Sequence, residues 1–93
     1  MRNTLTAFAI VFTVPAFAAQ PGIDRPGFDY KHFDVGAWDQ CNAACTDEGV
    51  KCKAWVYVVP GVMGPSGFCS LKWTKPAAVK NPKATSGDGP STF

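Results

Sequence analysis

The sequence has little of what nucleophilic catalysis or nucleic-acid binding requires. It contains a single histidine, His32, and its 9 basic and 7 acidic residues give a formal net charge of only +2. A triad-type nucleophile needs a base that a third group orients, and a phosphate loop needs a lysine and a following helix, which Pro60–Gly67 lacks. We interpret His32 as an exposed strand residue and Asp47-Glu48 as a solvated helix end. The prediction is a non-catalytic protein without metal or cofactor, and without a nucleic-acid partner.

The longest apolar run lies at the start of the chain and favours export over membrane anchoring. Arg2 precedes Leu5–Val14, Pro15 breaks the run, and Ala16-Phe17-Ala18 places small residues where a signal peptidase reads. A membrane anchor would need about 20 apolar residues. We therefore expect a signal peptide over 1–18, cleaved after Ala18. The remaining 93 − 18 = 75 residues would carry 8 basic and 7 acidic residues, a charge of +1, and no stable membrane anchor.

All four cysteines follow this leader, and their spacing contains no C-x-x-C redox motif. Zinc sites prefer matched cysteine pairs, whereas the gaps after Cys45 and Cys52 are irregular and the one histidine stands apart. A small exported domain usually adds disulfides because its hydrophobic core alone is marginal. Two disulfides in a secreted or periplasmic protein are the favoured interpretation, with a zinc site as the weaker alternative.

Periodicity and turn residues predict a short α+β order. A lead-in at 19–26 precedes an extended segment at 28–35, a helix at 38–48 that stops at Gly49, and a strand at 52–59. A loop at 60–67 leads to a strand at 68–73. The segment 77–93 is rich in Pro, Lys, Gly and Ser, and we expect it to be flexible.

Helix geometry decides how the cysteines pair. Cys41 and Cys45 are four apart on one helix face, too far from each other for a disulfide. The short turn after the helix returns Cys52 to the helix end, beside Cys45. The hairpin then brings Cys69 to the helix start. The expected bonds are Cys41–Cys69 and Cys45–Cys52.

Several motifs together resemble a bacterial PAN/Apple domain over about Arg25–Pro76. They are Gly27, Asp29, Tyr30 and Phe33, then Cys41-x-x-x-Cys45, Cys52-Lys-Ala-Trp-x-Tyr57, Pro60-Gly61-Val62 and Phe68-Cys69-x-Leu71-Lys72.

This resemblance implies a small disulfide-stapled antiparallel sheet, of five strands or fewer, cradling one α-helix, with the domain placed at 27–76 and the same nested disulfides. It also implies a non-catalytic module that recognises protein or carbohydrate outside the cytoplasm. Bacterial members often carry a further cysteine before a Ser-Gly pair. This chain keeps Ser86-Gly87 without that cysteine.

Strand alternation predicts a candidate binding face. If Cys52 and Cys69 face the helix, Ala54, Val56 and Leu71 point inward with them. The outward residues are then Lys53, Trp55, Tyr57, Phe68, Ser70 and Lys72. We take Lys53, Trp55, Tyr57 and Lys72 as the candidate ligand-binding residues, because aromatic rings with cationic edges suit sugars or protein surfaces.

Two alternatives stay open. Tyr30 and Phe33 could cover this face as a second small core, which would shift attention to Lys72, Lys75 and the 60–67 loop. The protein could also be a structural or inhibitory exported protein with no discrete ligand site.

Overall fold

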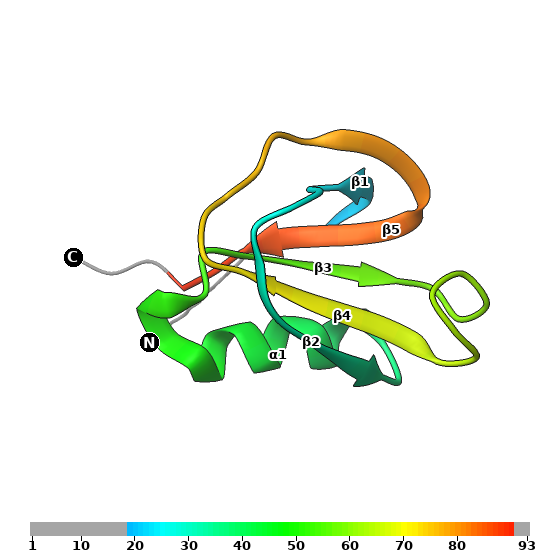
Figure 1. Ribbon diagram of the computed structural model, residues 1–93, viewed down its shortest axis with the longest axis horizontal. Coiled ribbons are helices and arrows are strands. Elements are labelled where there is room, and N and C mark those ends of the chain that lie inside the picture. Colours follow the sequence, from blue (N-terminus) through cyan, green and yellow to red (C-terminus); the bar gives the residue numbers. More distant parts are fainter. Residues whose placement is uncertain (1–18, 91–93) are drawn as a thin grey trace, which may run out of the picture.

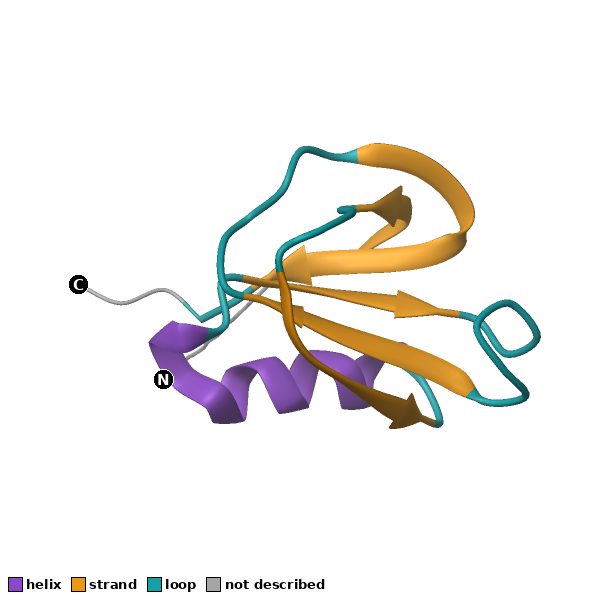
Figure 2. Ribbon diagram, in the orientation of Figure 1, coloured by secondary structure: helices purple, strands orange, loops and turns teal. Residues whose placement is uncertain are grey.

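The computed structural model describes residues 19–90, so the predicted signal peptide lies outside the described part. The elements in chain order are β1 (Gln20–Asp24), β2 (Asp29–Val35), α1 (Trp38–Glu48), a 3-10 turn (Gly49–Lys51), β3 (Ala54–Val58), β4 (Gly67–Lys72) and β5 (Val79–Asp88). The strands form a five-stranded antiparallel sheet in the order β1-β5-β3-β4-β2. Helix α1 lies along one face of this sheet (Figure 1; Figure 2). The predicted α+β fold is confirmed.

Helix α1 has the predicted bounds because local signals start and stop it. Gln40, in its first turn, bends back so that its side-chain oxygen accepts the backbone N–H of Gly36 at 2.6 Å. Gly49 ends the helix with a φ of 72°, a conformation that costs glycine little, and donates its N–H to the carbonyl of Thr46. Of the residues on the helix, Cys41 and Cys45 are the buried ones.

Both predicted disulfides are present and join α1 to the hairpin. Cys41 bonds Cys69 and Cys45 bonds Cys52, each pair with Cα atoms 5.4 Å apart, and the described residues include no free cysteine. The first bond spans 28 residues and ties the helix to β4. The second spans 7 residues and fixes the turn between the helix and β3. All four cysteines are fully buried in the core.

The core lies between α1 and one face of β3 and β4. Trp55 pairs with Leu71 across the two strands, and Tyr57 pairs with Cys69, so all four side chains lie on the helix face. Gly87 in β5 packs beneath the indole of Trp55: a Cβ built on it would lie 2.5 Å from the ring. This close approach requires a residue without a side chain.

Strand β5 corrects the prediction of a flexible segment after residue 77. Val79–Asp88 form a strand that pairs with β1 at Val79-Lys80 and again at Thr85-Ser86, and with β3 from Ala84 to Asp88. Between Lys80 and Thr85 the register with β1 shifts. Pro82 lies in this stretch and cannot donate to the ladder, and Lys83 donates its N–H to the side chain of Asn81. The strand therefore bends, and β1 rises with it on the side of the sheet away from α1 (Figure 1). The predicted lead-in at 19–26 likewise contains β1.

Candidate ligand groove

The face of the sheet opposite α1, here called the outer face, carries an open groove of about 470 Å³. Its floor is formed by β3 and β4, and one wall by the connection between β1 and β2. Met63, from the loop before β4, stands at the end where β4 begins. We call this feature the outer groove; its lining residues are Asp24, Pro26, Gly27, Phe28, Asp29, Val56, Val58, Met63, Phe68, Ser70 and Lys72. This volume lies in the range typical of ligand sites.

A buried lysine forms the polar end of the outer groove. Lys72 is only 3% exposed, and its ammonium pairs with the carboxylate of Asp29, its cross-strand neighbour on β2. A lysine this deeply buried is rare unless a partner compensates its charge. Asp29 is the more exposed of the two side chains, so a ligand in the groove can reach the carboxylate more easily than the ammonium.

Asp24 is the second carboxylate in the lining. Its Oδ1 accepts the backbone N–H of Arg25 at 2.7 Å. The guanidinium of Arg25 donates instead to the carbonyl of Pro76 at 2.7 Å and to the side chain of Gln20 at 3.1 Å. Arg25 thus holds the chain after β4 against β1, and its charge is not directed at Asp24.

An exposed aromatic side chain borders the same end of the groove. Phe28 has a φ of 62°, an unfavourable value for a residue with a side chain. Its ring meets Trp73 edge to face at 5.4 Å, and the backbone N–H of Trp73 donates to the backbone carbonyl of Phe28. Phe28 is 51% exposed although it is held in this strained conformation. Such strain persists where the surroundings impose it, often at functional positions.

The predicted placement of Trp55 and Tyr57 on the outer face is wrong. Trp55 is 1% exposed and Tyr57 is 8% exposed, and both lie in the core under α1. The prediction assumes that the in–out alternation of side chains begins at Cys52. The strand β3 begins only at Ala54, because a 3-10 turn ends at Lys51 and Cys52 lies in the connection that follows it. The alternation therefore has the opposite phase, and Val56 and Val58 occupy the outer face.

The count on β4 is right, because Cys69 lies within that strand. Phe68, Ser70 and Lys72 all line the outer groove, as the outward assignment required. Of the four candidate binding residues, only Lys72 lines the groove, and Lys53 is exposed elsewhere.

The suggestion that Tyr30 and Phe33 cover the outer face is also wrong, since both pack against the core on the helix side. Sequence reasoning missed Asp24, Phe28 and Val58. For Phe28 alone, the preceding Gly27 was a local indication of an unusual backbone turn.

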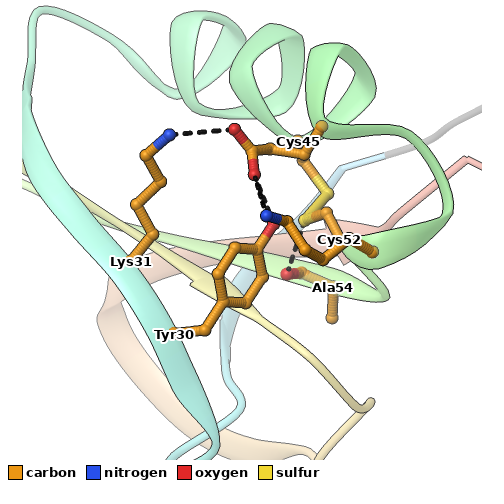
Figure 3. Close-up of polar contacts among 7 residues, drawn as sticks. Tyr30, Lys31, Cys45, Cys52 and Ala54 are labelled. Carbon is orange, nitrogen blue, oxygen red and sulfur yellow. Dashed lines mark hydrogen bonds and ion pairs between the residues drawn. A yellow bond between two sulfur atoms is a disulfide. The ribbon is translucent and has the colours of Figure 1, made fainter.

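A separate polar cluster ties β2 to the end of α1. Glu48 accepts a hydrogen bond from the Tyr30 hydroxyl at 3.1 Å and pairs with Lys31 at 2.9 Å, as Figure 3 shows beside the Cys45–Cys52 disulfide. Lys51 also lies near Glu48 and over the Tyr30 ring. Burial, followed by the hydrogen bond and the charge of Glu48, raises the pKa of Tyr30 to about 12. The hydrogen bonds from Lys31 and Tyr30 lower the pKa of Glu48.

This cluster joins β2 to α1 on the helix side and does not line the outer groove. His32 packs its ring against Phe68 at 5.3 Å. Within residues 19–90, no group of three His, Cys, Asp or Glu side chains is placed to hold a metal ion. Over the same residues, no helix is both long and apolar enough to cross a membrane.

The fold and its two disulfides define a small α+β module with an open groove on the sheet face opposite α1. A family model described as the PAN domain matches residues 23–72, more than half of the 93-residue chain. The chain belongs to the PAN domain family. The match begins within β1 and ends with β4, so β5 lies beyond it. A search of curated proteins finds no significant match. The PAN domain is a non-catalytic module that typically binds protein or carbohydrate.

Proposed function

We propose that this protein is a small exported bacterial interaction module that binds protein or carbohydrate outside the cytoplasm through the outer groove. The observation that carries the proposal is the groove itself. Aliphatic side chains line its floor and one end, and three charged side chains, Asp24, Asp29 and Lys72, are grouped in its lining. A largely apolar concavity with a few placed polar groups is the usual form of a recognition site.

Export is supported by two independent features. The first 18 residues have the pattern of a signal peptide. The domain also depends on two buried disulfides, which form and persist in oxidising compartments. We infer a secreted or periplasmic location. Intact-mass measurement of the exported protein should show the loss of residues 1–18, and a retained Met1 in a membrane-extracted form would contradict it.

Binding through the outer groove can be tested by filling it. Val58 lines the groove and is partly exposed, so Val58→Trp should place an indole in the open space. Val50 is equally apolar and half exposed but lies in the 3-10 turn after α1, which makes Val50→Trp the matched control.

Glycan and peptide arrays probed with the disulfide-bonded protein should give a signal that Val58→Trp abolishes and Val50→Trp preserves. Equal binding by both variants would place the site elsewhere. Failure to bind anything on either array would favour a structural or inhibitory protein.

A further inference from the structure

We propose that the outer groove binds an extended peptide of a partner protein, one that carries an apolar residue and, four positions later, a basic residue. This inference rests on the proposed function and names the ligand of the same site. It comes from the distribution of charge, the position of the apolar side chains and the length of the groove floor.

The lining of the groove is net negative. Asp24 and Asp29 contribute two carboxylates, and Lys72, the one cation in the lining, is already paired with Asp29. Within residues 19–90, the carboxylate of Asp24 takes part in no ion pair. It accepts a hydrogen bond from the backbone N–H of Arg25. Asp34 is a further exposed carboxylate on the outer face; it lies opposite Phe68, outside the groove lining. A guanidinium or ammonium group therefore complements this face better than an anion does.

The opposite end of the groove is apolar. Met63 is 59% exposed, and Val58 and Phe68 line the floor beside it. Met63 is unbranched and polarizable, which lets it adapt to different apolar partners. An aliphatic or aromatic side chain placed here would bury apolar surface that the free protein leaves in contact with water.

The spacing of the two ends matches an extended peptide. Phe68 and Lys72 are four residues apart on β4, which is about 13 Å in a strand. In an extended ligand, residues at positions 1, 3 and 5 point to the same side. An apolar residue at position 1 and a basic residue at position 5 would then reach the Met63 end and the two carboxylates together.

The lining favours a peptide over a sugar. Sugar recognition relies on free aromatic faces, but Phe68 is engaged with His32, and Phe28, the other ring in the lining, meets Trp73 edge to face. The remaining apolar lining consists of Val56, Val58, Met63 and Pro26, which suit aliphatic side chains.

Calorimetric titration of the disulfide-bonded protein with blocked pentapeptides tests the inference. The first peptide has leucine, three serines and arginine; the second replaces arginine with glutamate; the third replaces leucine with serine. We expect the first to bind, and the other two to bind about fivefold more weakly or not at all.

Two variants and two controls assign the contacts. Asp24→Asn removes one charge but keeps the oxygen that accepts the Arg25 N–H, so it should fold normally. It should lower the affinity for the arginine peptide about fivefold. Met63→Ser should also lower this affinity, because it removes the apolar contact. At exposed positions outside the groove, Asp47→Asn repeats the first change and Val50→Ser likewise replaces an apolar side chain with serine. They should leave binding unchanged.

Equal binding of the arginine and glutamate peptides, or unchanged binding by Asp24→Asn, would overturn the inference. So would the absence of any peptide binding. If a glycan binds instead, and Val58→Trp abolishes that binding, the peptide inference fails while the groove remains the functional site.

Discussion

The indole of Trp38 stacks on that of Trp55, with ring centroids 5.9 Å apart and planes inclined by 9°. Trp55 thus has Trp38 from the helix against its ring and Gly87 from β5 beneath it. This stack joins three elements that are distant in the sequence. Because the Trp55 ring lies directly against Gly87, a residue with a side chain would not fit at this position.

Trp55→Ala should strongly destabilise the protein. Removing a buried tryptophan costs about 3–5 kcal/mol, and in a domain of this size about 1 kcal/mol shifts the unfolding midpoint by roughly 4–8 °C. With both disulfides intact, we expect the midpoint temperature of thermal unfolding to fall by more than about 10 °C. Trp38→Ala is the matched control: Trp38 is 42% exposed and should cost clearly less. Equal effects of the two variants would contradict the packing.

Gly87→Ala should also destabilise the protein, for the opposite reason. The added methyl group would lie 2.5 Å from the Trp55 ring, far inside van der Waals contact, and Gly87 is held in the ladder with β3. Overpacking of this kind typically costs about 1–3 kcal/mol. Gly64→Ala, where nothing lies within 4 Å of the new Cβ, is the control. A Gly87→Ala protein as stable as the parent would show that the stack can move apart.

The two disulfides should contribute unequally to stability. Loop-entropy arithmetic gives about 3.5 kcal/mol for the bond that closes 28 residues and about 2.5 kcal/mol for the one that closes 7. The double variant Cys41→Ala/Cys69→Ala should therefore unfold at a lower denaturant concentration than Cys45→Ala/Cys52→Ala. The reverse order would mean that the short bond, at the turn beside Glu48, contributes more than its loop length predicts.

The pair between Lys72 and Asp29 should be strongly non-additive. Asp29→Asn leaves a buried ammonium without its counter-charge, at a cost of about 3–5 kcal/mol. Lys72→Met removes that charge and keeps the apolar length, so it should cost less. In Asp29→Asn/Lys72→Met the penalty of the first change should largely disappear in a denaturation experiment. Additive losses would show that the pair is not coupled.

Two groups beside α1 should make stability depend on pH at both extremes. The pKa of Glu48 is lowered in the folded protein, so its contribution is present above its ordinary pKa and is lost as pH falls through the folded value. The pKa of Tyr30 is raised from 10 to about 12, so stability should decline as pH rises from 10 towards 12.

Glu48→Gln tests both effects. It should flatten the acid side of the stability profile and lower the Tyr30 midpoint, which ultraviolet absorbance of tyrosinate follows. Because burial is the largest cause of the Tyr30 shift, the midpoint should remain above 10. Tyr30→Phe identifies the titrating residue among the two tyrosines. If the Tyr30 titration midpoint were unchanged in Glu48→Gln, the hydrogen bond between Tyr30 and Glu48 would be contradicted.

Local chemistry made much of the fold predictable from the sequence. Gly49 supplies the positive φ that ends α1, and the spacing of Cys41 and Cys45 forbids a bond between them. The short turn to Cys52 and the hairpin to Cys69 then determine both disulfides. Each of these inferences depends on residues close in sequence, or on cysteines whose bonding geometry leaves few options.

Only the tertiary structure decided which residues outside β4 form the groove. The outward face of β3 could not be counted from Cys52, because Cys52 follows a 3-10 turn and lies before β3, where the period of two has not begun. Trp55 therefore lies in the core and Val58 faces the groove. The β5 segment looks flexible by composition, and it is a strand because β1 and β3 supply hydrogen-bonding partners on both sides. Asp24 and Lys72 line the same groove although β5 and β3 lie between their strands in the sheet, a long-range relationship that no local pattern encodes.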